Sequence, residues 1–77
     1  HSTIQITPNP AKEIINLETD DDNTDIEQIN IFDITGRIVL THFTLSMPID
    51  ISTLEPGTYT LLAINKSGLK IGKFVKI

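Results

Sequence analysis

The 77-residue sequence has no cysteine, few aromatic residues (5%) and no apolar run long enough to span a bilayer. Without cysteine, the chain has neither disulfide bonds nor thiolate metal ligands. A domain this small buries only about 60–65% of the surface that its unfolded chain exposes, so packing alone must close its core. Basic residues are also scarce, with 6 against 10 acidic ones. The net charge of −4 argues against nucleic-acid binding, which needs a basic surface.

The residues that are abundant favour an all-β fold. Apolar residues make up 39% of the chain, isoleucine is the commonest of them, and threonine is frequent. Both are β-branched, lose side-chain freedom in a helix and pack well on a pleated sheet. Residues 20–28 contain too few apolar side chains for the stripe of an amphipathic helix.

Short runs of alternating apolar and polar residues recur along the chain, separated by turn signals. Such runs, spaced roughly 8–12 residues apart, are typical of sandwiches and barrels. About seven short, mostly antiparallel strands predict an immunoglobulin-like β-sandwich. The expected strands lie near residues 3–7, 14–17, 27–34, 37–43, 49–52, 59–64 and 69–77.

Two turns have specific residue patterns. Asp33 and Gly36 bracket a tight turn, because aspartate can cap the backbone two residues on and glycine supplies a positive φ. Pro56 and Gly57 occupy the central positions of an expected type II turn. Tyr59 follows it and resembles a tyrosine corner, whose hydroxyl bonds to backbone a few residues upstream. The alternative is that Tyr59 forms a platform for a ligand.

Catalysis has little support in this sequence, and no cofactor is expected. His42 lies in an extended apolar run, and Ser46 and Ser52 suit turns or strand edges better than a nucleophile's place. Asp33 and Asp50 would make a carboxylate pair only if the fold brought them together. Since no motif supplies nucleophile, base and orienting group together, we expect no catalytic residue.

Charged residues are unevenly placed. Lysines without an acidic neighbour fill the C-terminal end, an arrangement that would steer a charged partner or would simply form a solvated face. The acidic segment Asp20–Asp25 is rich in the oxygen ligands that calcium prefers. It lacks the glycine and the bidentate glutamate of an EF-hand loop. Adjacent aspartates repel one another, so we expect a solvated loop and no metal site.

Four segments, in their order and spacing, resemble the type A C-terminal sorting domain of the type IX secretion system of Bacteroidota. They are Ile6–Ala11, Ile29–Val39, Ile49–Tyr59 and Lys73–Lys76. The resemblance covers nearly the whole chain. It implies a structural role for ten residues: Pro8, Asn9, Pro10, Asp33, Gly36, Arg37, Leu54, Pro56, Gly57 and Tyr59. It implies that the sorting signal is Lys73, Phe74, Val75, Lys76 and Ile77.

The resemblance also implies a function. Residues 3–77 would be the C-terminal sorting domain of a larger secreted protein, and residues 1–2 would come from a tag or linker. The cargo fused before the domain would cross the periplasm and reach the cell surface or the medium. Shuttle or receptor components at the outer membrane would recognise the domain, and a sortase-like peptidase would then remove it. Two alternatives are an adhesive or carbohydrate-binding sandwich and a purely structural domain of a secreted enzyme.

The last expected strand has two further features. If its edge is accessible, a partner can pair with it by β-augmentation, and an edge-strand dimer stays open. Lys73 and Lys76 project to opposite faces of a regular strand. Leu69, Ile71, Val75 and Ile77 share one face, which Lys73 interrupts. We therefore expect either Lys73 near a sheet margin or a bulge at Gly72.

Overall fold

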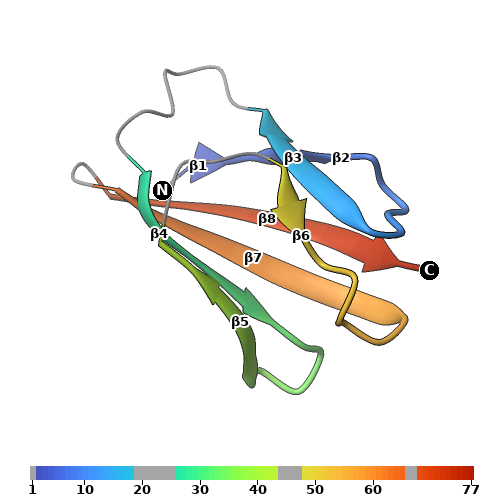
Figure 1. Ribbon diagram of the computed structural model, residues 1–77. Coiled ribbons are helices and arrows are strands. Elements are labelled where there is room, and N and C mark those ends of the chain that lie inside the picture. The colour runs from blue at the N-terminus through green and yellow to red at the C-terminus, as the bar shows by residue number, and fades with distance from the viewer. Residues whose placement is uncertain (1, 19–25, 44–47, 66–67) are drawn as a thin grey trace.

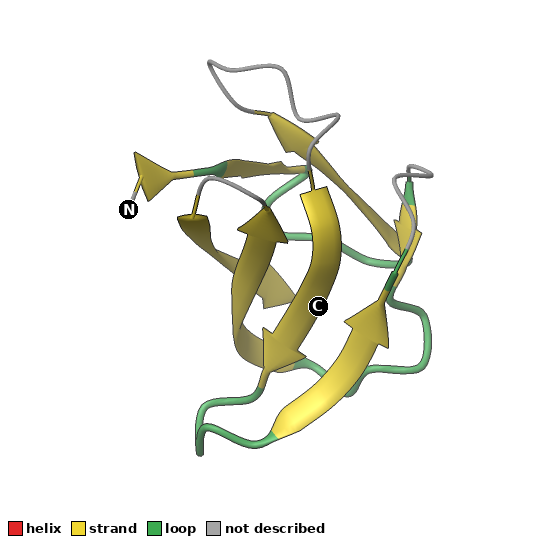
Figure 2. Ribbon diagram, turned by 90° about the vertical axis from the view of Figure 1, so that its left-hand side faces the viewer, coloured by secondary structure: helices red, strands yellow, loops and turns green. Residues whose placement is uncertain are grey.

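The computed structural model describes residues 2–18, 26–43, 48–65 and 68–77, which form two layers of β-sheet (Figures 1 and 2). Within these ranges no helix is present, and so none that could cross a membrane. The predicted all-β sandwich is confirmed. Its strands are β1 (Ser2–Thr3), β2 (Gln5–Thr7), β3 (Ile14–Glu18), β4 (Ile26–Phe32), β5 (Ile38–His42), β6 (Ile49–Asp50), β7 (Gly57–Asn65) and β8 (Gly68–Lys76).

The larger sheet has the strand order β1-β8-β7-β4-β5, and the smaller one has the order β2-β3-β6. Every pair is antiparallel except β1 with β8. The first strands therefore begin in the larger sheet and cross to the smaller one. The seven antiparallel strands agree with the sequence, and the two-residue parallel β1 is an addition to it.

The core lies between the sheets and follows the alternation in the sequence. Ile29 and Ile31 in β4 are fully buried, as are Leu61 and Ala63 in β7. Ile15 in β3 closes the core from the smaller sheet. The largest fully buried side chains are Phe74, Ile15, Ile29, Ile31, Ile49, Ile51 and Leu61. Isoleucine dominates this set because its branched side chain fills the space between two pleated surfaces.

The turn between β4 and β5 forms as predicted. Asp33 Oδ1 accepts hydrogen bonds from the backbone N–H of Thr35 at 2.9 Å and of Arg37 at 3.1 Å. The N–H of Gly36 donates to the Asp33 carbonyl at 3.0 Å, and Gly36 has a φ of 90°. A type I turn followed by a left-handed residue is a common three-residue hairpin connection. Glycine takes that left-handed place without steric cost.

The expected type II turn at Pro56-Gly57 is wrong. Gly57 has a φ of 157°, far from the roughly +80° of that turn, and it begins β7 opposite Lys76. Pairing with β8 draws Gly57 into extended backbone. The chain reverses earlier instead, where the N–H of Leu54 donates to the Ile51 carbonyl at 3.0 Å.

The tyrosine corner is confirmed. The Tyr59 hydroxyl donates to the backbone carbonyl of Glu55 at 2.5 Å. Tyr59 itself is buried, with 7% of its surface exposed, so its ring belongs to the core. This arrangement ties the loop before β7 to the strand that follows it, as in other Greek-key sandwiches.

Strand β8 contains no bulge, contrary to expectation. Its register with β7 runs unbroken from Gly57 opposite Lys76 to Asn65 opposite Gly68. Gly72 has a different role, because a Cβ there would lie 2.7 Å from both the carbonyl oxygen and the Cγ2 of Ile4. Gly72 therefore gives the N-terminal segment room to cross from one sheet to the other.

The expected grouping of apolar residues along β8 is confirmed, but their shared face is the outer one. Leu69 and Val75 are 44% and 40% exposed. The inner face carries Gly72 and Phe74 between two buried lysines, Lys70 and Lys76. Lys73 therefore lies on the outer face of a strand that has neighbours on both sides, and not at a sheet margin.

Candidate functional site

The predicted sorting signal alternates between the two faces of the larger sheet. Lys73, Val75 and Ile77 are exposed, Val75 by 40% and Ile77 by 54%. Phe74 and Lys76 point inward and are 1% and 8% exposed. Only three of the five side chains are therefore available to a partner while the domain stays folded.

Phe74 fixes the segment to the core. Its ring stacks on that of Tyr59, with centroids 5.5 Å apart and an angle of 22° between the planes. Such stacked pairs stabilise a fold by about 0.5–1.5 kcal/mol beyond the area that they bury. Since the Tyr59 hydroxyl is bound to Glu55, the corner and the sorting segment form one packed unit.

Lys76 is buried next to small residues. Gly57 of β7 lies opposite it on one side, and Ala11 forms a parallel bridge with it on the other. Neither neighbour has a long side chain, so the aliphatic stem of Lys76 can lie on the core while its amine reaches outward. Its Nζ donates to the Ile77 carbonyl at 3.5 Å, which is a long hydrogen bond.

Asn9 occupies the edge of β8 with its side chain. Its Oδ1 accepts from the Val75 N–H at 3.0 Å, and its Nδ2 donates to the Lys73 carbonyl at 3.5 Å. The side-chain amide thus takes the place of a backbone peptide in a strand. Pro8 and Pro10 flank it, and both follow cis peptide bonds.

Backbone on either side of Asn9 pairs with the same edge. The Ile4 N–H donates to the Ile71 carbonyl at 3.0 Å. The Ala11 N–H donates to the Val75 carbonyl at 2.7 Å, and the Ile77 N–H donates to the Ala11 carbonyl at 2.8 Å. The condition for β-augmentation is therefore not met, because segment 4–11 covers β8 on the side opposite β7.

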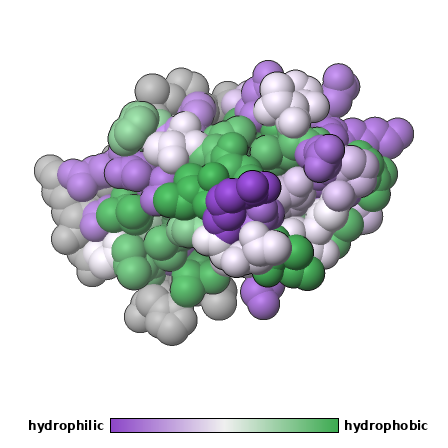
Figure 3. All heavy atoms as spheres, turned by 90° about the horizontal axis from the view of Figure 1, so that it is seen from below, coloured by the Kyte–Doolittle hydropathy of each residue, from purple (hydrophilic) through white to green (hydrophobic). Residues whose placement is uncertain are grey.

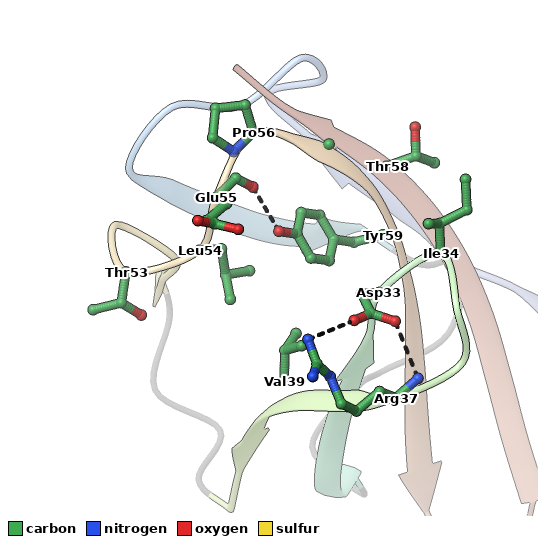
Figure 4. A pocket seen from close by; sticks show the side chains of 11 residues that line it. Asp33, Ile34, Arg37, Val39, Thr53, Leu54, Glu55, Pro56, Thr58 and Tyr59 are labelled. Carbon is green, nitrogen blue, oxygen red and sulfur yellow. Dashed lines mark hydrogen bonds and ion pairs between the residues drawn. The ribbon is translucent and has the colours of Figure 1, made fainter.

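The middle two motif segments meet at one end of the sandwich. There, the turn between β4 and β5 faces the loop before β7 across a surface hollow (Figure 4). Arg37 Nη2 lies 3.2 Å from Asp33 Oδ2 at its margin, with the Arg37 side chain 79% exposed. The motif residues that line the hollow are Asp33, Arg37, Leu54, Pro56, Gly57 and Tyr59.

Both carboxylates considered for catalysis serve their own turns. The Thr35 hydroxyl, with backbone N–H groups and the Arg37 charge, holds the pKa of Asp33 below its usual value, against an opposing effect of burial. The Ser52 N–H and hydroxyl lower the pKa of Asp50. Each aspartate therefore stays ionised as a turn cap. This suits neither a general acid nor a base poised near neutral pH.

No group of three or more metal-binding side chains occurs in the part of the chain that the structure describes. The candidate calcium segment Asp20–Asp25 lies outside the described residues, and so does Ser46.

Sequence reasoning missed the role of two residues of the site, Ala11 and Gly72. Ala11 lies beside β8 and Gly72 lies within it, and each is small enough to admit another segment at close range. The available signal was a glycine inside a strand pattern, which marks either a bulge or a close backbone approach. The second alternative is the correct one here.

One known protein family matches this sequence. The family model of the secretion system C-terminal sorting domain matches residues 5–77, nearly the whole chain. No curated protein and no solved structure matches the chain.

Proposed function

We propose that residues Lys73–Ile77 form the segment that the type IX secretion machinery recognises. The chain belongs to the family of secretion system C-terminal sorting domains. The domain itself is a sorting signal of that system, and its family role is transport, not catalysis. It directs export toward the cell surface or the extracellular space. The family match over residues 5–77 is the observation that carries this conclusion.

The exposed side chains of the segment suit recognition of a folded domain. Lys73, Val75 and Ile77 point outward, whereas Phe74 and Lys76 hold the strand in the core. Because segment 4–11 covers the free edge of β8, a receptor would read side chains and not add a strand. A folded domain would thus be presented the same way whatever cargo it carries.

We propose the remaining steps on the resemblance stated above. A cargo fused before the domain crosses the periplasm, and shuttle or receptor components at the outer membrane bind the domain. A sortase-like peptidase then separates the domain from its cargo.

A fluorescent reporter tests the segment. Residues 3–77 are fused to a reporter that carries a Sec signal peptide, in a host with the type IX machinery. The deletion of Lys73–Ile77 should leave the reporter in the periplasm. Because that deletion removes Phe74 from the core, the sharper variant replaces only Lys73, Val75 and Ile77 with alanine.

The matched control replaces three polar positions of the smaller sheet, Gln5, Asn16 and Glu18, with alanine. Circular dichroism establishes that both triple variants fold. We expect the control to be exported like the wild type and the outward variant of the segment to be retained. If the outward variant of the segment and the control are exported equally, the machinery does not recognise Lys73, Val75 and Ile77.

A further inference from the structure

The two sheets have outer faces of different character. On the smaller sheet the outward positions are mostly polar, and Thr7 Oγ1 donates to Glu18 Oε2 at 3.0 Å across it. An antiparallel sheet with one solvated face normally alternates apolar and polar residues in this way. The larger sheet departs from that rule, since apolar residues line both of its faces.

We define the outer face of the larger sheet by the outward positions of β4, β5, β7 and β8. Figure 3 views the molecule from below and shows apolar side chains gathered over the middle, with hydrophilic ones among and around them. A contiguous exposed apolar area marks an interaction site. Its apolar members are Phe32, Ile38, Leu62, Ile64, Leu69, Ile71 and Val75, and its polar members are Gln28, Asn30, Thr41, Thr58, Thr60 and Lys73.

Lys73 is the one charged side chain among these members; the exposed Glu27 of β4 lies at the register irregularity between Ile26 and Gln28, at the other end of that strand from Phe32. Lys73 lies beside Thr60, which lies beside Phe32 in the next strand. A surface hollow adjoins it, lined by Phe32, Asp33, Ile34, Gly36, Thr58 and Thr60 as well as by Lys73 itself. Ile34 at its rim is 85% exposed. The face therefore offers an apolar seat with a positive charge beside it.

We propose that this outer face docks a component of the type IX machinery whose contacting surface is apolar and carries a carboxylate opposite Lys73. The inference rests on the proposed function, because Lys73 and Val75 of the sorting segment belong to the same face. The inner side of the segment is buried and its edge is covered, so the outer face is the side from which a partner reaches it. The contact then extends beyond the segment onto β7 and β4.

A second copy of the chain fits this face less well. An isologous dimer needs a self-complementary patch, in which each charge meets an opposite one. The members of the outer face named above include no carboxylate to meet Lys73, and Asp33 in the adjoining hollow is already paired with Arg37 and caps its own turn. Burial of an unpaired ammonium opposes association, so a partner with an acidic side chain is favoured.

The test uses the whole domain in the reporter fusion, with one substitution inside the sorting segment and one outside it. Lys73→Glu reverses the charge. Leu62→Glu places a carboxylate in the middle of the outer face on β7. Asn16→Glu on the smaller sheet is the matched control. We expect the first two to lower export by about tenfold or more and the control to leave it unchanged.

Thermal unfolding by circular dichroism accompanies each variant. If Leu62→Glu lowers the midpoint, then Leu62→Thr replaces it, since threonine keeps a branched side chain in the strand. If a folded Leu62 variant is exported normally while the Lys73→Glu variant stays in the periplasm, the docking face is overturned. The proposal for the sorting segment then still stands. Failure of the unaltered domain to export the reporter would instead overturn the proposed function.

Two further measurements distinguish other occupants. Sedimentation of the purified domain at high concentration detects a dimer, and flotation with phosphatidylglycerol vesicles detects a lipid surface. A monomer that does not float supports the proposal. If Leu62→Glu abolishes a dimer, the face is an interface between two copies of the chain; if it abolishes a vesicle complex, the face binds lipid. Either result would overturn the proposal.

Discussion

Replacement of Gly72 by alanine tests the crossing of the N-terminal segment over β8. The added Cβ would lie 2.7 Å from the Ile4 carbonyl oxygen and from Ile4 Cγ2, and 2.9 Å from Ile6 Cδ1. The Ile6 atom ends a side chain and can move. The Ile4 oxygen is backbone, and Ile4 is held because its N–H donates to the Ile71 carbonyl at 3.0 Å.

The expected loss combines two opposing effects. Overpacking a filled site costs about 1–3 kcal/mol. Alanine in place of a strand glycine regains about 0.5–1 kcal/mol of backbone entropy. We expect Gly72→Ala to lower the free energy of unfolding by about 1–2 kcal/mol, which corresponds to a fall of about 5–15 °C in the thermal midpoint for a domain of this size.

Thermal and urea unfolding of the purified domain measure this loss. The same substitution in a truncated domain that starts at Gln5 is the control, because it lacks Ile4. There Gly72→Ala should cost much less, since only the movable Ile6 side chain remains in its way. An equal loss in the two backgrounds, or no loss in the full domain, would refute the crossing as the reason for the glycine.

Three further substitutions test other parts of the fold. Tyr59→Phe removes the hydroxyl that donates to Glu55, and we expect a loss of about 0.5–1.5 kcal/mol in urea unfolding; an unchanged midpoint would contradict the tyrosine corner. Asp33 has a lowered pKa in the folded state. Its contribution to the free energy of unfolding is therefore fully present above the ordinary pKa of 3.8, and it is lost as the pH falls through the folded-state pKa. Unfolding of Asp33→Asn, followed against pH, should therefore show a shallower loss below about pH 4 than the wild type, and identical slopes would contradict this. Asn9→Ala leaves the Val75 N–H without its side-chain acceptor, and we expect lower stability and dimers by sedimentation at high concentration; a monomer of unaltered stability would show that Asn9 does not protect the edge.

Local patterns in the sequence were sufficient for the cap at Asp33, the tyrosine corner and the grouping of apolar residues by strand face. The period of two in β4 places Ile29 and Ile31 on one face, which the structure buries, and a carboxylate three residues before a glycine predicts the cap at Asp33. The tyrosine corner follows from Tyr59 in its place after Leu54, Pro56 and Gly57. These features depend on residues a few positions apart, which is why one sequence reveals them.

The direction of β8 was not predictable in this way. Alternation shows which residues share a face, but it does not show which face is inward. Lys70 and Lys76 lie on the inner face despite their charge, because Phe74 and Gly72 between them are the residues that fit the core and the crossing chain. Contacts from distant segments decide this, and a local pattern does not contain them.

The covering of the β8 edge is also a long-range effect. Asn9 and Val75 are 66 positions apart in the sequence and meet only in the folded domain. The pattern Pro-Asn-Pro predicts a loop and says nothing about what its amide binds. The fold therefore changes the mode of recognition that the sequence suggested, from an open edge to the side chains of an outer face.

Two of the aromatic residues that a carbohydrate-binding surface would need are buried in this domain. Tyr59 and Phe74 stack on each other inside the core, so neither presents a ring face to a sugar. Phe43 is the aromatic residue with large exposure in the described part of the chain, at 69%.

The expected division into residues 1–2 and 3–77 stays a prediction, although Ser2 already pairs with Lys70 in β8.

The most direct test of the sorting function compares one reporter fusion in two strains. The reporter with its Sec signal and residues 3–77 is expressed in a host with the type IX machinery and in the same host without it, and the reporter outside the cells is measured. We predict export that requires both the domain and the machinery. Equal amounts outside both strains, or none outside either, would contradict the assignment of this domain as a sorting signal.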